Sequence, residues 1–435
     1  AMNNGLLFLA LVPVLIFTVI GIRFVTRGTP VKRVQASTRA SEAAPIEDPR
    51  FLANLELLAK VNLIPGNTVE LCTCGDETYP RLWDDMRSAQ RSITLQMYYA
   101  QPGKVADTFH DIMCERAKAG VKVLFLRDAF GAQKLQGEYL ASLERAGVEV
   151  ATFRPVNWWA LEKAYTRSHI RVATCDATIG WTGGFGIDDK WLGDGHTHDQ
   201  WRDTTARFTG PSVAQLQATF AAGWAEATGN LLTGDAFFPA SRDANEREQP
   251  GEGVMAGVLH AAPTIGSTAA ERFIALIIAS ARKRLWITNA YFVPDADFVG
   301  LITHAVERGA DVRLLLPCEE SDAKSVLYAS RAAYPLLLRG GVRIFEFQPA
   351  MHHAKTLVAD SLFGAVGTMN FDNRSLAFND ETMLAFHDAG TAQRLEGIFE
   401  QDLGYAREIT LEAFNAFPLW QRAAGRVLYG MRRML

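Results

Sequence analysis

The chain has 435 residues, a formal net charge of −4 and an apolar content of 48%. The length allows two or three domains with a large core, and the charge argues against a globally basic surface for nucleic acid. Five cysteines at wide spacings fit neither a disulfide framework nor a zinc site, which indicates a reducing compartment.

The first predicted element is an apolar segment at residues 1–25. No charged residue precedes Arg23, and about 20 apolar residues form roughly 30 Å of helix, enough to cross a bilayer. A cleaved signal peptide is the alternative, but residues 2–5 lack the positive charge with which such peptides begin. By the positive-inside rule, the basic residues after the span place the rest of the chain in the cytoplasm. These residues are Arg23, Arg27, Lys32, Arg33 and Arg39.

An internal repeat follows a polar linker at residues 26–50. Three strand-like runs recur after about 190 residues, each with similar neighbours, which indicates duplication of one unit. The matched runs are 91–99 with 283–291, 119–127 with 308–316, and 145–150 with 339–344. Alternating strands and helices with short glycine turns predict an α/β fold. We therefore expect two duplicated halves, 51–235 and 236–415, each with a mixed β-sheet flanked by helices.

The last segment, residues 416–435, mixes large apolar residues with arginines. A basic amphipathic stretch of this kind can lie on an anionic membrane surface. The alternative is a helix packed on the body of the protein with its arginines in solvent.

Each half carries a histidine motif after its repeated strands. In the second half, His353 is followed by Lys355 and then by Asp360. Residues two apart on a strand project to the same side, so the imidazole can attack phosphorus while the ammonium holds a non-bridging oxygen. In the turn that follows, the Thr368 hydroxyl and the Asn370 amide can donate to the same oxygens.

The first half repeats this motif at nearly the repeat spacing. His169 is followed by Arg171 and Asp176, and then by a turn that contains Gly184 and Gly186. A single copy would be a modest signal, because buried histidines often only fill a core. Two copies at the repeat spacing indicate one site that takes an imidazole from each half.

The two motifs resemble the H-x-K-x-x-x-x-D signature of the phospholipase D superfamily. Other runs resemble bacterial cardiolipin synthases, and the resemblance extends from about residue 65 to the C-terminus. These runs are 75–77, 201–204, 210–211, 291–294, 370–376 and 379–381.

The resemblance implies a phosphatidyl transfer that needs neither a metal nor another cofactor. One histidine attacks the phosphodiester to form a phosphohistidine, and the other protonates the departing alkoxide and then deprotonates the incoming alcohol. The family favours His169 as the nucleophile and His353 as the acid and base. Phosphatidylglycerol would be donor and acceptor, so that glycerol leaves and cardiolipin forms.

The resemblance also implies roles for the supporting residues. In the family the carboxylate that orients each histidine comes later in each half, at positions that match Asp203 and Glu381; a salt bridge with Arg202 is the alternative for Asp203. We interpret Asp176 and Asp360 as structural. The residues expected to bind the substrate phosphate are Arg171, Lys355, Gly184, Thr368 and Asn370.

The first half departs from the family pattern at three positions. Arg171 stands in place of lysine, Gly186 in place of asparagine, and Gln96 where a glutamate is usual. Arginine keeps the charge but is larger and forked, and glycine offers no side-chain donor. These changes bear on substrate choice, on rate and on which histidine is the nucleophile.

Two other functions remain open from the sequence. A phospholipase D-type hydrolase would differ only in taking water as the acceptor, and a non-catalytic membrane scaffold could descend from the same fold. The expected partner is a phospholipid membrane containing phosphatidylglycerol and cardiolipin, with no nucleic acid; whether the chain forms a homo-oligomer stays open. The predicted location is the bacterial inner membrane, with one span and the catalytic part in the cytoplasm.

Overall fold

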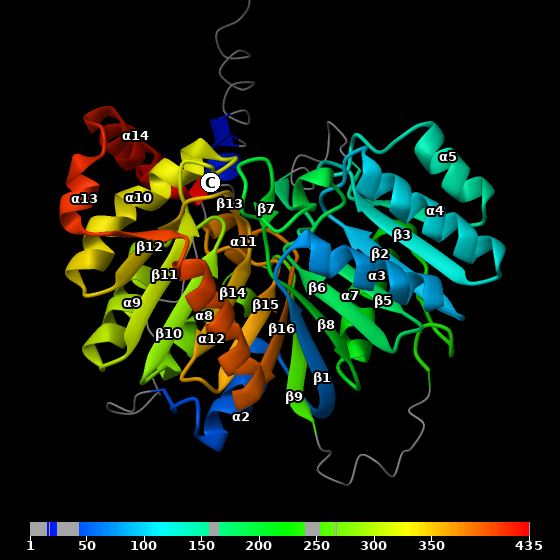
Figure 1. Ribbon diagram of the computed structural model, residues 1–435, viewed down its shortest axis with the longest axis horizontal. Coiled ribbons are helices and arrows are strands. Elements are labelled where there is room, and N and C mark those ends of the chain that lie inside the picture. The colour runs from blue at the N-terminus through cyan, green and yellow to red at the C-terminus, as the bar shows by residue number, and fades with distance from the viewer. Residues whose placement is uncertain are drawn as a thin grey trace, which may run out of the picture.

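The computed structural model describes residues 15–16, 18–23, 43–155, 165–239, 253–264, 266 and 268–434. Within these ranges, one mixed sheet of 15 strands runs through the molecule, with helices packed against it (Figure 1). The strand order is β17-β12-β11-β10-β14-β15-β16-β9-β1-β8-β6-β5-β2-β3-β4. This architecture confirms the predicted α/β class with a mixed sheet.

The first half contributes eight of the strands described. They are β1 (Ile64–Cys72), β2 (Ser92–Met97), β3 (Lys122–Asp128), β4 (Glu149–Phe153), β5 (Arg171–Cys175), β6 (Ile179–Gly183), β7 (Trp201–Arg202) and β8 (Thr205–Thr209). Its helices are α3 (Gly75–Ser88), α4 (Lys104–Lys118), α5 (Glu138–Arg145), the short η1 (Asp189–Trp191) and α7 (Val213–Thr228).

The second half repeats this succession. Its strands are β9 (Val254–Ala261), β10 (Arg284–Asn289), β11 (Asp311–Pro317), β12 (Arg343–Phe347), β13 (Met351–His352), β14 (Lys355–Ala359), β15 (Phe363–Gly367), β16 (Glu381–His387) and β17 (Ala406–Ile409). Its helices are α8 (Ala269–Ser280), α9 (Ala296–Glu307), α10 (Lys324–Arg339), α11 (Asn373–Ala377), α12 (Ala389–Leu403), α13 (Leu411–Ala416), α14 (Leu419–Gly430) and η3 (Arg432–Met434).

The two halves have the same strand order, read outward from the centre of the sheet. The order β1-β8-β6-β5-β2-β3-β4 is matched by β9-β16-β15-β14-β10-β11-β12. In both halves the last three strands are parallel to one another and the others pair antiparallel. The repeat seen in the sequence is therefore a repeat of topology.

The expected sheets of the two halves are joined into one. Strands β1 and β9, the first of each half, pair antiparallel, with Ile64 opposite Ala256 and Asn67 opposite Val254. The Asn67 side chain strengthens the junction by donating to the Val254 carbonyl at 3.1 Å. The free edge that each half would otherwise expose is thereby covered by the other.

Successive strand residues feed cores on opposite faces of the sheet. In β3, Val123 and Phe125 pack beneath α3, α4 and α5, whereas Leu124 and Leu126 point to the other face. That second core also holds Phe386 from the second half, so it is shared by both halves. A third core lies beneath α8, α9 and α10.

Helix α2 (Pro49–Ala59) packs on the second half, although the boundary drawn from the sequence at residue 51 assigns it to the first. Its Phe51 ring meets Phe363 edge-on, with centroids 5.3 Å apart. The helix buries Phe51, Leu55 and Ala59 against this core, as its apolar periodicity requires.

Most of the predicted membrane anchor at residues 1–25 and most of the linker at 26–50 lie outside the described residues. Residues 15–16 and 18–23 are helical. Among the described parts of the chain, no helix is both long and apolar enough to span a bilayer.

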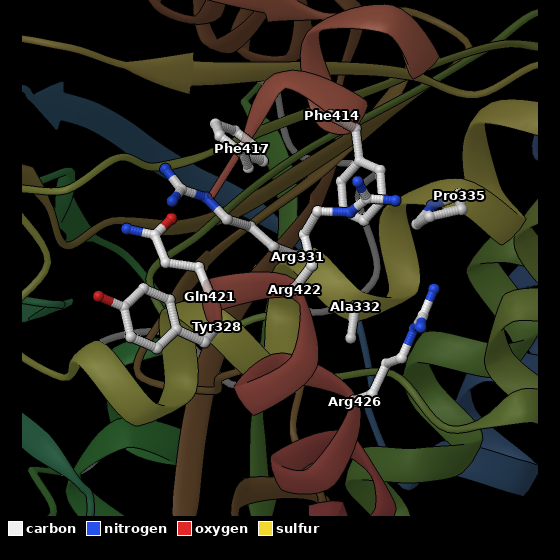
Figure 2. A pocket seen from close by; sticks show the side chains of 9 residues that line it. All are labelled: Tyr328, Arg331, Ala332, Pro335, Phe414, Phe417, Gln421, Arg422 and Arg426. Atoms are coloured by element: carbon white, nitrogen blue, oxygen red, sulfur yellow. The ribbon is translucent and has the colours of Figure 1, made fainter. Parts of the chain in front are cut away.

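The C-terminal segment packs against α10. A Cβ on Gly425 of α14 would lie 2.4 Å from the Tyr328 carbonyl oxygen, so glycine allows the two helices to approach closely. Between α10, α13 and α14 lies a cleft of about 40 Å³, lined by aromatic and arginine side chains (Figure 2). Its Arg331 is paired with Glu346. On α14, the side chains of Trp420 and Val427 are exposed.

The two motif aspartates lie in equivalent turns. The Asp360 carboxylate accepts hydrogen bonds from three successive backbone N–H groups, those of residues 282, 283 and 284, where β10 begins. The Asp176 carboxylate does the same for residues 90, 91 and 92 before β2. Both aspartates have left-handed backbone conformations, with φ of 53° and 55°. Each carboxylate thus ties the motif hairpin to the first repeated strand.

We expect Asp360→Ala to lower the free energy of unfolding by about 2 kcal/mol, because three backbone donors lose a charged acceptor. Thermal and denaturant unfolding of the full chain measures this. Asp84→Ala is the control: Asp84 is exposed and pairs only with Arg87 among the described residues, so its loss should change stability by less than about 0.5 kcal/mol. Equal effects of the two substitutions would contradict the structural role.

Candidate active site

Both histidines lie where the two halves exchange backbone hydrogen bonds. The segment before His169 pairs in parallel with the segment before Glu381, and the His169 N–H donates to the Asp380 carbonyl at 2.8 Å. In the same way β13 pairs with β7, and the His353 N–H donates to the Arg202 carbonyl at 2.6 Å. Each histidine is therefore positioned beside a segment of the opposite half.

The carboxylates that hold the imidazoles are exchanged between the halves. His169 Nδ1 lies 3.0 Å from both carboxylate oxygens of Glu381, and His353 Nδ1 lies 2.9 Å from Asp203 Oδ2. From the sequence we expected an orienting carboxylate later in each half; the structure shows that it serves the histidine of the other half. Arg202, the alternative partner considered for Asp203, is instead paired with Asp402.

This arrangement fixes one ring nitrogen of each histidine and leaves Nε2 for chemistry. Burial, aided by the positive charges of Arg171 and Lys355, holds the pKa of both imidazoles well below its usual value. Burial raises the pKa of Glu381 to about 8. At neutral pH both imidazoles are therefore predominantly neutral, as a nucleophilic nitrogen must be.

Two buried cations face the histidines. Lys355 Nζ lies 2.9 Å from His353 Nε2, and burial followed by the charge of Arg171 lowers the pKa of Lys355 well below its usual value. The guanidinium of Arg171 is also buried, and its Nε and Nη1 have no hydrogen-bond partner within the part of the chain that is described. An anion between Arg171 and Lys355 would pair with both groups and raise the pKa of the lysine again.

The glycines of the first motif make room for the Asp203 carboxylate. A Cβ on Gly184 would lie 2.3 Å from Asp203 Oδ1, and a Cβ on Gly186 would lie 2.9 Å from the Trp191 ring. The Trp191 indole N–H donates to Asp203 Oδ2 at 2.9 Å. At Gly186, where the family has asparagine, an indole from η1 fills the space and holds the carboxylate.

The second motif uses its small residues differently. The Thr368 hydroxyl donates to Glu381, so its proton orients the carboxylate that holds His169. The sequence had suggested that this hydroxyl faces the substrate oxygens. Asn370 is buried with its Oδ1 unpartnered among the described residues, and it remains a candidate for substrate contact.

Comparisons with known proteins agree with this geometry. A family model described as "Cardiolipin synthase, PLD-like domain" matches two segments, residues 82–224 and 274–403. Cardiolipin synthase 2 of Bacillus anthracis is 33% identical over 366 residues, covering 84% of this chain and 70% of the relative. The chain belongs to the cardiolipin synthase family.

Other relatives are consistent with this assignment. Cardiolipin synthase A of Pseudomonas syringae pv. syringae strain B728a is 32% identical over 365 residues, covering 83% of this chain and 74% of that protein. The crystal structure of phosphatidylserine synthase from Haemophilus influenzae Rd KW20 superposes with a TM-score of 0.66 at 14% identity, over 89% of this chain and all of that one. At that identity it shows a shared fold alone.

The sequence analysis did not identify the aromatic residues that surround His353 in the candidate active site. Trp201 and Trp191 lie 4.7 and 5.5 Å from its ring, centroid to centroid, and Tyr291 lies at 6.1 Å. On the other side Tyr98 meets His169 edge-on at 5.0 Å. A signal was available, since Trp201 and Tyr291 belong to runs that resemble cardiolipin synthases and Tyr98 belongs to a repeated strand. Nothing in their spacing linked these residues to the histidines.

Gly184→Ala should lower turnover by about 100-fold, because the added methyl would displace the Asp203 carboxylate from His353. Steady-state kinetics together with thermal unfolding measures it. Gly300→Ala is the matched control, since a Cβ there meets nothing within 4 Å and the position is helical. An active Gly184→Ala enzyme would show that the Asp203 contact is dispensable.

Proposed function

We propose that the chain is a phosphatidyl transferase that makes cardiolipin from two molecules of phosphatidylglycerol and releases glycerol. The observation that carries the proposal is the pair of unfilled guanidinium donors on Arg171 beside Lys355, between two histidines held by buried carboxylates. A phosphodiester supplies the single negative charge that this arrangement lacks. The relatives named above, which are called cardiolipin synthases, agree with this choice of substrate.

The proposed reaction has two steps. The first step begins with His353 protonated, a state that the bound phosphodiester anion favours. His169 Nε2 then attacks phosphorus, the bond to the glycerol oxygen breaks, and His353 gives the leaving alkoxide its proton. In the second, His353 takes the proton of a phosphatidylglycerol hydroxyl, whose oxygen displaces His169 from phosphorus. Arg171 and Lys355 hold the non-bridging oxygens in both steps, where charge accumulates in the transition state. The assignment of His169 to the attack follows the family.

Hydrolysis to phosphatidic acid is the alternative reaction of the same site, because only the incoming alcohol differs. The buried setting of both histidines disfavours water as the acceptor. A scaffold without activity would have no reason to keep Arg171 buried with unfilled donors.

His169→Ala and His353→Ala should each reduce cardiolipin formation by at least 10⁴-fold, because each removes a group that acts in both steps. Purified protein is incubated with phosphatidylglycerol and the products are separated by mass. Cardiolipin with equimolar glycerol supports transfer, and phosphatidic acid supports hydrolysis. The His353→Ala protein should trap a phosphatidyl group on His169; a trapped group in His169→Ala instead would reverse the two roles. No turnover by the unaltered protein would contradict the proposal.

We further propose that α14 lies on the anionic lipid surface from which the substrate is drawn. Its outward stripe is apolar, with Trp420 61% and Val427 65% exposed, and it is continued by Met431 and Met434. Exposed Arg426 on the same helix, with basic residues after it, adds the positive charge that favours anionic lipid.

This helix is connected to loops that border the site. The Tyr429 hydroxyl donates to the Pro294 carbonyl at 2.9 Å, just after the loop that carries Tyr291. The Asn373 amide, three residues beyond Asn370, donates to the Arg433 carbonyl at 2.9 Å. Figure 1 shows α14 at the same edge of the molecule as β7 and β13. The same proposal includes a membrane anchor at residues 1–25. It places the catalytic part at the cytoplasmic face of the bacterial inner membrane.

Val427→Glu should lower the rate on vesicles of phosphatidylglycerol about 10-fold, because it places a negative charge in the apolar stripe. Brominated phosphatidylglycerol should also quench the fluorescence of Trp420. The Trp420 signal is the difference in fluorescence between the unaltered protein and Trp420→Phe. Leu57→Glu is the control, since Leu57 is 66% exposed on α2, at the opposite edge of the molecule (Figure 1). If both glutamate variants lose activity equally, or if Trp420 is not quenched, α14 does not contact lipid.

A further inference from the structure

Lys190 holds an ammonium group inside an aromatic cage next to the candidate active site. It lies on η1, and its Nζ is 3.4 Å from the centre of the Trp201 ring, 3.9 Å from that of Tyr99 and 4.8 Å from that of Trp191. The side chain is half-buried, and this burial lowers the pKa of Lys190 to about 8. Removing water around the ammonium strengthens any interaction that it makes with an anion.

Among the residues for which contacts are described, no carboxylate forms an ion pair with this ammonium within 4.0 Å. The charges of Asp188 and Asp322 act on it only from farther away. Asp188 accepts the backbone N–H of Lys190 at 3.0 Å, and Asp322 accepts the Tyr291 hydroxyl at 2.9 Å. A direct ion pair with the ammonium is therefore left for a ligand.

The ammonium lies close to one of the two histidines. Trp201 is shared: its ring centre is 3.4 Å from Lys190 Nζ and 4.7 Å from the centre of the His353 ring, so these two lie at most about 8 Å apart. The charge of Lys190 also helps to lower the pKa of His353. Lys190 is thus a third cation that acts on His353, in addition to Arg171 and Lys355, which are proposed to hold the reacting phosphate.

The proposed product contains two phosphates at a comparable separation. In cardiolipin a glycerol bridge of six bonds, each about 1.5 Å long, joins the two phosphorus atoms, which puts them roughly 6 to 8 Å apart. When the acceptor hydroxyl reaches the reacting phosphorus, the acceptor's own phosphate must lie at about this distance from it. A second anion therefore needs a second cation near His353.

We propose that Lys190 binds the phosphate of the acceptor lipid and so makes the enzyme choose a phospholipid alcohol over water or a simple alcohol. This inference rests on the proposed phosphatidyl transfer and deepens it. The aromatic rings hold the ammonium near His353, where it can pair with the acceptor phosphate. Lys190 is then a residue that determines acceptor specificity.

Competition between two acceptors tests the proposal. Mixed micelles of phosphatidylglycerol are incubated with the full chain in the presence of ethanol, which has a hydroxyl but no phosphate. Transfer to lipid gives cardiolipin and transfer to ethanol gives phosphatidylethanol, so their ratio reports on the acceptor site independently of the first step. Lys190→Met keeps the apolar stem within the cage and removes the charge.

In Lys190→Met the ratio of cardiolipin to phosphatidylethanol should fall about 10- to 100-fold, as expected for the loss of a charged hydrogen bond. Lys190→Arg should retain most of the ratio. Lys122→Met is the matched control: Lys122 also lies over an aromatic ring, that of Phe237 at 5.7 Å, but at the start of β3, and its loss should leave the ratio unchanged. Lys190→Gln provides a second uncharged variant should the methionine variant fold poorly.

Two results would overturn the inference. If both products fall together in the uncharged variants, Lys190 supports the loop and does not select the acceptor; if the ratio stays constant, the acceptor phosphate is bound elsewhere. In either case the unaltered protein still makes cardiolipin, so phosphatidyl transfer itself stands. A protein that forms neither product overturns the proposed function instead.

Discussion

The crossed contacts between histidines and carboxylates are the constraint on which the rest of the structure depends. His169 is held by Glu381 and His353 by Asp203, so that each imidazole takes its orientation from the other half. Neither half can form a working histidine alone. Two strand pairings fix the two halves in one register and so hold the crossed contacts in place. These pairings are β1 with β9, which makes the sheet continuous, and β7 with β13. Duplication thus produced a site that requires both copies.

The site also concentrates buried charge, which is costly for a folded protein. Removing charges from water carries a penalty that is recovered only when every donor and acceptor is paired. Asp203 meets this condition, because it accepts from His353, from the Trp191 indole and from the Thr204 backbone N–H. Arg171 does not, since two of its donors have no protein partner within the described ranges. In the proposed reaction an anionic substrate would supply the missing partner, so that binding energy would be directed at its phosphate.

The sequence predicted the motif residues because their chemistry is local. A histidine and a cation two apart on a strand, repeated with their neighbouring strands, are enough to identify both half-sites. It could not predict which carboxylate serves which histidine, because that depends on contacts between segments about 150 and 212 residues apart. Nor could it show that Trp191 fills the space at Gly186, or that Thr368 donates to Glu381. These features follow from packing between elements, which a linear pattern does not record.

The two half-sites differ in the donors that surround their carboxylates. Asp203 accepts from the Trp191 indole and the Thr204 backbone N–H besides His353, whereas Glu381 accepts from the Thr368 hydroxyl besides His169, and burial raises the pKa of Glu381 to about 8. A transferase in which one histidine attacks and the other moves a proton needs such inequality. Trp191, which fills the space beside Gly186, contributes to the difference because its indole N–H donates to Asp203. The same indole forms one wall of the cage around Lys190, so one side chain contacts both the ring of His353 and the ammonium proposed to bind the acceptor.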